Sequence, residues 1–236
     1  MSTKLTFDHV EAEAPNISTF YFRPEKRFEY TAGQYVELTL KHANPDNRGE
    51  TRRFTLSSSP TDELLSITNK FTDKDGSTFK DALGKLQSGD SLHISKPMGD
   101  FILPSQIQMP IIFVAGGIGI TPYRSMVSWM RAMGERRPVD LFYGARNETE
   151  LLSKTIFEGI IDEIAIMLSS PSADWKGDRG YLTAKHIISS KKMSPETRIY
   201  LSGPEGMVAS IQKELISAGV PANQLVLDLF VGYDVA

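Results

Sequence analysis

The stretch PIIFVAGGIGITP, residues 110–122, joins an apolar strand, a glycine turn and the start of a helix in direct succession. Its apolar run, 111–115, is typical of a strand covered on both faces of a parallel sheet. Thr121 then begins a helix as its N-cap, with Pro122 at the first helical position. Three glycines separate the two elements: Gly116, Gly117 and Gly119. Because glycine lets backbone amides approach a ligand and a helix N-terminus attracts anions, this order predicts a phosphate site, with a plain tight turn as the alternative.

The alternation of strand and helix continues to the end of the chain. Apolar runs predict four more strands, at residues 139–145, 163–170, 198–204 and 225–230. Helical periodicity predicts one helix from residue 121 to Gly134 and three others near residues 148–161, 183–191 and 205–218. This pattern predicts a doubly wound, five-stranded parallel sheet over residues 105–236.

Residues 1–104 have a different period. Six segments alternate apolar with polar residues and are rich in Val, Ile, Thr, Phe and Tyr, which favour strands. These segments are residues 4–14, 17–25, 34–41, 52–59, 64–71 and 90–97. With one short helix from Thr78 to about Leu86, they predict an antiparallel Greek-key β-barrel. We therefore expect two domains, 1–104 and 105–236, with a boundary near residues 103–110.

The composition excludes several classes of protein. The chain has 236 residues, 40% of them hydrophobic and 23% charged, as in soluble globular proteins. A net charge of −3 offers no basic platform for nucleic acid. The absence of cysteine excludes disulfides, thiolate nucleophiles and iron–sulfur ligands, and the four histidines lack metal-ligand spacing. Without a signal peptide or an apolar run near the roughly 20 residues that span a bilayer, we expect a cytoplasmic protein with no metal site and no membrane insertion.

A second candidate site lies in RRFTLSSSP, residues 52–60. On a strand, Arg52 and Phe54 share one face and Thr55 takes the other. A guanidinium for phosphate, a ring for stacking and a hydroxyl for hydrogen bonding suit an aromatic nucleotide cofactor. The alternative is a strand with a surface arginine.

These two stretches belong to a set of six motifs that resembles the ferredoxin–NADP reductase superfamily along essentially the whole chain. Arg52-x-Phe54-Thr55 resembles the family's R-x-Y-S flavin motif. The other five resemble, in order, the second flavin motif, the loop that closes the barrel, the pyridine-nucleotide pyrophosphate loop, the C-G-P-x-x-M element and the C-terminal E-x-aromatic. They are GSTF (76–79), PMGDF (97–101), AGGIGITP (115–122), SGPEGM (202–207) and DLF (228–230).

In the barrel, the resemblance implies an FAD site. Arg52 pairs with the pyrophosphate, Phe54 packs against the isoalloxazine ring, and Thr55 hydrogen-bonds flavin N5. The start of the short helix assists with the pyrophosphate through Gly76, Ser77 and Thr78. Lys70 is either a further cofactor contact or a solvated lysine.

In the second domain, the resemblance implies a site for NADH or NADPH. The turn residues Gly116, Gly117, Gly119 and Thr121 hold the pyrophosphate, with Thr121 also near the nicotinamide. Gly203 and Pro204 shape the nicotinamide pocket. Ser169, Ser170 and Pro171 stand where NADP-specific members place a cation, which favours NADH. Dual use is the main alternative, with Arg146, Lys176 or Arg179 as the cation.

The chain departs from the family pattern at three site residues. Phe54 replaces the usual tyrosine and keeps the stacking ring. Ser202 replaces the cysteine that faces nicotinamide C4, and Asp228 replaces the glutamate, one methylene longer, of the family's proton relay. Either Phe230 or Tyr233 covers the flavin, and we favour Phe230 because it holds the motif position. With Thr55, Ser202 and Asp228 are the catalytic candidates.

The resemblance implies an FAD-dependent NAD(P)H oxidoreductase in which hydride passes from nicotinamide to flavin N5. Because the chain lacks cysteine for an iron–sulfur domain, we expect a separate electron acceptor. Candidate acceptors are a ferredoxin, a flavodoxin, an oxygenase component or a small redox molecule. The alternatives are a free-flavin or ferric reductase and a non-catalytic subunit that binds FAD.

Overall fold

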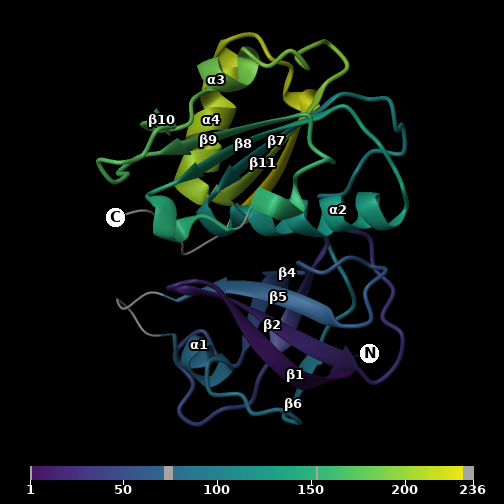
Figure 1. Ribbon diagram of the computed structural model, residues 1–236. Helices are drawn as coiled ribbons and strands as arrows, with labels where there is room; N and C mark the ends of the chain where they lie inside the picture. Colours follow the sequence, from purple (N-terminus) through teal and green to yellow (C-terminus); the bar gives the residue numbers. More distant parts are fainter. Residues whose placement is uncertain (1, 72–76, 153, 231–236) are drawn as a thin grey trace.

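The computed structural model describes residues 2–71, 77–152 and 154–230. It consists of a barrel half and an α/β half stacked on one another, with helix α2 (Thr121–Ala132) lying along the junction between them (Figure 1). Gly76 and Tyr233, two of the predicted site residues, fall outside the described residues.

The first half is the predicted antiparallel barrel. Its strands are β1 (Thr3–Ala14), β2 (Ile17–Pro24), β3 (Tyr35–Thr39), β4 (Thr51–Thr55), β5 (Leu65–Lys70) and β6 (Ser91–Ile94). They pair in the order β4-β3-β6-β1-β2-β5, and a bridge between Leu56 and Ile67 joins the two edges. Alternate residues point inward, and α1 (Thr78–Leu83) adds the fully buried Phe79 and Leu83 to this core.

The second half is the predicted doubly wound parallel sheet. Its strands lie in the order β10-β9-β8-β7-β11-β12. Their bounds are β7 (Ile111–Gly116), β8 (Val139–Ala145), β9 (Glu163–Leu168), β10 (Asp178–Arg179), β11 (Arg198–Pro204) and β12 (Leu225–Phe230). The five predicted strands are confirmed, but the predicted strand count was wrong by one, because the sheet has a sixth, β10. This two-residue strand is polar and exposed at the edge of the sheet, so no apolar pattern in the sequence predicts it.

Helices cover both faces of the parallel sheet. α2 packs on one face, and α3 (Ala184–Ile188) and α4 (Glu205–Ser217) pack on the other. The continuous apolar run of β7 is explained by this arrangement, because Phe113 faces α2 while Val114 packs in the cluster that contains α4.

The helix predicted near residues 148–161 is replaced by two short 3-10 turns, η2 (Glu148–Glu150) and η3 (Lys154–Ile156). Asn147 accepts a hydrogen bond from the amide of Thr149, which closes the first turn. The chain is then extended at Leu151, and the amide of Leu152 donates to the Tyr143 hydroxyl at 3.3 Å instead of to a helical carbonyl. The apolar spacing therefore serves packing under the sheet rather than a helix.

The two halves share a hydrophobic core. Ile17, Ala32 and Phe101, which precede the parallel sheet, are buried in the same cluster as Tyr123 and Met126 of α2. This cluster fixes the barrel against the α2 face of the sheet.

Candidate functional site

The glycine turn at residues 116–120 lies where the strand order of the parallel sheet reverses. β7 is central and the chain continues to β8 on one side and, later, to β11 on the other. Ligands of doubly wound sheets bind outside the carboxyl ends of the strands at this switch point. The turn therefore occupies the position that the fold reserves for a ligand.

Close packing explains why glycine is required in this turn. A Cβ on Gly119 would lie 2.3 Å from the Ser202 carbonyl oxygen, and one on Gly116 would lie 2.4 Å from Met207 Sδ. Gly117 adopts a φ of +51°, in the left-handed region that favours glycine. The glycines thus bring the turn after β7 directly against the end of β11 and the start of α4.

The start of α2 differs from the prediction in one detail. A 3-10 turn, η1 (Gly117–Ile120), precedes the helix, and Ile120 rather than Thr121 holds the N-cap position. The Thr121 hydroxyl donates to the Ile118 carbonyl at 3.1 Å, so it ties the turn to the helix. The predicted succession of strand, turn and helix is otherwise present.

Ser202 and Asp228 meet on neighbouring strands. They are partners in the register of β11 and β12, and Ser202 Oγ donates to Asp228 Oδ2 at 3.2 Å. Burial raises the pKa of Asp228 to about 6, against the opposing effect of the Ser202 hydrogen bond. Gly203 follows at a φ of +150°, and Pro204 pairs with Phe230 in the same register. The candidate residues of the second half therefore converge at the ends of β7, β11 and β12.

Arg52 is held by a loop of the barrel. Its guanidinium contacts Asp46 Oδ1 at 2.8 Å, donates to the carbonyls of Arg48 and Gly49, and lies 5.3 Å from the centre of the Phe79 ring. Hydrogen bonds from Arg48, with the charges of Arg52 and Arg48, hold the pKa of Asp46 well below its usual range. An anionic ligand of Arg52 has to compete with this carboxylate.

The N-terminus of α1 adjoins the same loop. Ser77 is the N-cap and accepts from the Lys80 amide, while Thr78 Oγ1 accepts from the Asp46 amide at 2.9 Å. Lys80 Nζ donates to the Lys70 carbonyl at 2.9 Å. Burial lowers the pKa of Lys80 to about 8, and the charges of Arg48, Lys70 and Arg52 act in the same direction. Four cationic side chains therefore converge here, which favours an anion.

Phe54 and Thr55 complete this side of the barrel. The Phe54 ring is half-buried with its centre 5.9 Å from that of Phe79, and Thr55 is buried at the end of β4. Lys70 Nζ, from β5, lies 2.9 Å from Glu150 Oε2 in the other half of the molecule. Lys70 is thus neither solvated nor isolated, and its partner comes from a residue 80 positions further along the chain.

The loop after β9 holds an acidic side chain that the local sequence does not reveal. Glu148 Oε1 accepts from Ser172 Oγ at 2.6 Å and from the Ser172 amide at 3.1 Å. Arg179 donates to the carbonyls of Ser172 and Trp175, so this guanidinium is engaged within the loop. The fold thus brings Glu148, from beyond the end of β8, against Ser172 in the loop that follows β9.

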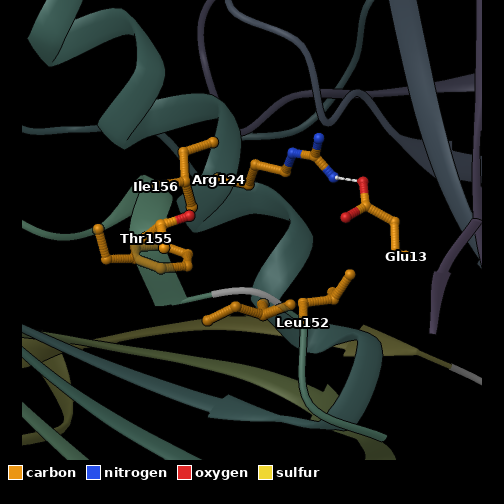
Figure 2. Close-up of a pocket in the computed structure, with 7 residues that line it drawn as sticks. Glu13, Arg124, Leu152, Thr155 and Ile156 are labelled. Atoms are coloured by element: carbon orange, nitrogen blue, oxygen red, sulfur yellow. Dashed lines mark hydrogen bonds and ion pairs between the residues drawn. The ribbon is translucent and has the colours of Figure 1, made fainter. Parts of the chain in front are cut away.

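A cavity of about 250 Å³ opens between the two halves beside these sites. Figure 2 shows Glu13 of the barrel and Arg124 of α2 directed toward one another across it, joined as an ion pair. Leu152, Thr155 and Ile156 line the opposite side. Of the predicted site residues that the structure describes, none lines this cavity, although Arg124 lies one helical turn from Thr121.

Comparison with known proteins finds a family match for the second half and relatives that align with nearly the whole chain. Residues 113–213 match the model of the oxidoreductase NAD-binding domain family. Flavohemoprotein A of Dictyostelium discoideum is 24% identical over 94% of this chain and 59% of its own length. The reductase component of propane 2-monooxygenase from Mycolicibacterium goodii is 26% identical over 94% of this chain and 65% of its own length.

Solved structures share the complete two-part fold. An Amycolatopsis cytochrome P450 reductase superposes with a TM-score of 0.82 at 21% identity, over 98% of this chain and 70% of its own. A ferredoxin NADP⁺ reductase from Neisseria gonorrhoeae superposes with a TM-score of 0.77 at 18% identity, over 97% of this chain and 98% of its own. The chain therefore resembles NAD-binding oxidoreductases in its second half and has the two-part fold of these reductases. The chain spans about three fifths of the length of the curated relatives named above.

Several side chains at these sites were missed in the sequence because no motif links them to their partners. Asp46, Lys80 and Glu150 carry no motif, and each is recognised only once the fold places it beside Arg52 or Lys70.

Among the described residues, no helix combines the length and apolarity needed to cross a bilayer.

Proposed function

We propose that the chain is an FAD-dependent NAD(P)H oxidoreductase that passes electrons to a separate acceptor. The observation that carries this proposal is the pairing of two anion-favouring sites in one molecule. One is the cation cluster around Arg52 in the barrel, and the other is the glycine turn at the switch point of the parallel sheet. The Neisseria gonorrhoeae relative in this fold holds FAD and NADP, which supports the same assignment here.

The barrel residues suit the pyrophosphate and ring of FAD. Arg52 and Lys70, which pair with Asp46 and Glu150, would offer their positive charges to the pyrophosphate. Ser77 and Thr78 would add hydroxyl and amide donors, with Gly76 beside them in sequence. Phe54 would pack against the isoalloxazine ring, and Thr55 would hydrogen-bond N5. Bound FAD supplies a two-electron acceptor that can release electrons one at a time.

The residues of the second half suit a nicotinamide nucleotide. Amides of Gly116, Gly117 and Gly119 would meet the pyrophosphate, and Thr121 would hold the turn in place. Ser202 would face the nicotinamide with its hydroxyl oriented by Asp228. Asp228, whose pKa is raised to about 6, can hold or release a proton near neutral pH. Phe230, next to Pro204, would cover the flavin ring. We assign these roles to domains at residues 1–104 and 105–236.

The acceptor is proposed to be a partner protein or a small redox molecule. The reductase component of propane 2-monooxygenase and the electron transfer component of toluate 1,2-dioxygenase are among the relatives, which favours an oxygenase component. A ferredoxin, a flavodoxin or a small acceptor is the alternative. Turnover with each acceptor class at fixed NADH, after reconstitution with FAD, distinguishes them.

The decisive experiment is anaerobic mixing of the FAD-reconstituted protein with NADH. We expect FAD to bind and its visible absorbance to bleach stoichiometrically. Binding without bleaching would indicate a non-catalytic FAD subunit. Saturable turnover with free flavin or ferric chelate, with no gain from any carrier protein, would indicate a free-flavin or ferric reductase. A protein that retains no flavin would refute the proposal.

A further inference from the structure

The first two turns of helix α2 carry both a predicted nucleotide-site residue and the side chains that contact the barrel. Thr121 begins the helix, and Arg124 and Ser125 follow one turn later. Ser125 is completely buried, and the Arg124 side chain is only 18% exposed. One turn advances about 5.4 Å along a rigid helix, so both side chains have a fixed relation to Thr121.

Ser125 binds the segment that follows Thr55 in the barrel. Its Oγ donates to the Ser58 carbonyl at 2.6 Å. The Tyr30 hydroxyl donates to the same carbonyl at 2.8 Å and lies 2.9 Å from Ser58 Oγ. Ser58 is therefore held from the barrel side by Tyr30 and from the sheet side by Ser125. A short path, Thr121 to Ser125 and Ser58 to Thr55, joins the two candidate sites.

Arg124 makes a second connection through buried hydroxyls. Its Nη1 pairs with Glu13 Oε1 and donates to Thr19 Oγ1 at 3.2 Å, as the ion pair in Figure 2 shows in part. Thr19 Oγ1 in turn donates to Glu13 Oε1 at 2.8 Å and lies 2.9 Å from Thr68 Oγ1. Thr68 Oγ1 donates to Ser57 Oγ at 3.0 Å. This series of hydrogen bonds ends at Ser57, which also lies within three residues of Thr55.

We propose that Ser125 and Arg124 are positioning residues that set the separation between the flavin and the nicotinamide. The inference rests on the proposed function. Hydride transfer needs donor and acceptor atoms at about 3–3.5 Å, and a displacement of about 1 Å can lower the rate about a hundredfold. A partly buried ion pair contributes little net stability, because desolvation offsets the attraction.

The test is the Ser125→Ala variant, compared with Ser210→Ala on α4, whose hydroxyl bonds Glu214 on the same helix. The variant is expected to fold, because the Ser58 carbonyl keeps its bond from Tyr30. In stopped-flow reduction by saturating NADH, we expect the limiting rate to fall about tenfold for Ser125→Ala. Retention of FAD and the Kd for NADH should change less than about twofold, and Ser210→Ala should match wild type.

Glu13→Gln provides a second variant that weakens the Arg124 pair while keeping an acceptor at that position. Its control is Arg131→Gln, which removes a guanidinium of α2 that bonds the Glu158 carbonyl in the same half. We expect Glu13→Gln to slow reduction in the same way and Arg131→Gln to leave it unchanged. An unchanged rate in both Ser125→Ala and Glu13→Gln, or a loss confined to FAD retention or to the Kd for NADH, would overturn the inference.

A measurement without flavin separates this inference from the proposed function. The Ser57 amide donates to the Ser66 carbonyl and the Ser66 amide donates to Ser58 Oγ. Hydrogen exchange at both amides therefore reports on the stability of the segment around Ser58. In the flavin-free protein, hydrogen exchange at both should accelerate about fivefold or more in Ser125→Ala. Unchanged exchange would overturn the inference even if wild type is reduced by NADH. Accelerated exchange in a protein that NADH does not reduce would refute the proposed function alone.

Discussion

The Arg52 guanidinium is bound by Asp46, a carboxylate that an anionic ligand has to displace. We expect Arg52→Ala to lower FAD affinity ten- to a hundredfold, since a charge-assisted hydrogen bond contributes about 1.5–3 kcal/mol. Arg53→Ala is the matched control, because Arg53 lies on the opposite face of β4 with 71% of its side chain exposed. Fluorescence titration of the flavin-free proteins measures both affinities. Equal affinities for wild type and Arg52→Ala would show that Arg52 does not bind the pyrophosphate.

Asp228 links stability to pH in a direction set by its raised pKa. Folding favours the protonated carboxyl, so the wild type binds more protons folded than unfolded between the ordinary pKa of 3.8 and about 6. Its stability therefore decreases across that window as pH rises. Asp228→Asn removes this penalty and should gain roughly 1–2 kcal/mol relative to wild type between pH 4 and pH 7.5. Urea unfolding at both pH values measures the gain, with exposed Asp174→Asn as control. A difference independent of pH would contradict the prediction.

At the scale of elements, periodicity predicted what depends on local burial and missed what depends on distant partners. In the six barrel strands and the five parallel strands, the spacing of apolar residues follows which faces of the strand are buried. The edge strand β10 has no such repeat, and η2 and η3 replace a helix because Leu152 bonds Tyr143. The candidate residues of both halves were found by motif. Asp46 and Lys80 were not found by motif. They come close to Arg52 and Lys70 only when the loop that contains Asp46 and helix α1 have folded.

The loop after β9 determines coenzyme choice in our proposal, and its chemistry favours NADH. Glu148 is brought beside Ser172, while Arg179 is occupied by backbone carbonyls. A carboxylate at this edge repels a doubly charged 2′-phosphate. We expect wild type to prefer NADH and Glu148→Gln to raise kcat/KM for NADPH about three- to tenfold at low salt, with little effect on NADH. Glu158→Gln controls for net charge. A wild-type preference for NADPH above tenfold would contradict this reading of the loop.

At the scale of the whole molecule, contacts between the halves could not be predicted from the sequence. Arg124 pairs with Glu13 across 111 positions and Lys70 with Glu150 across 80, and neither pair leaves a local pattern. Apolar residues of the barrel, Ile17 and Phe101, are buried against α2. The two halves are therefore joined by one core and by ionic contacts around it, so that neither reaches its full burial alone.

This shared core leads to a prediction about unfolding. Separating the halves would expose Ile17, Ala32 and Phe101 together with their partners on α2, and exposing each large apolar side chain costs about 1.5–3 kcal/mol. We therefore expect one cooperative transition for both halves. Both tryptophans, Trp129 and Trp175, lie in the second half, whereas the proposed flavin site lies in the barrel. In urea, tryptophan emission, flavin release and, for the flavin-free protein, far-ultraviolet circular dichroism should give coincident midpoints. A barrel transition that precedes or follows the tryptophan transition would show that the halves unfold independently.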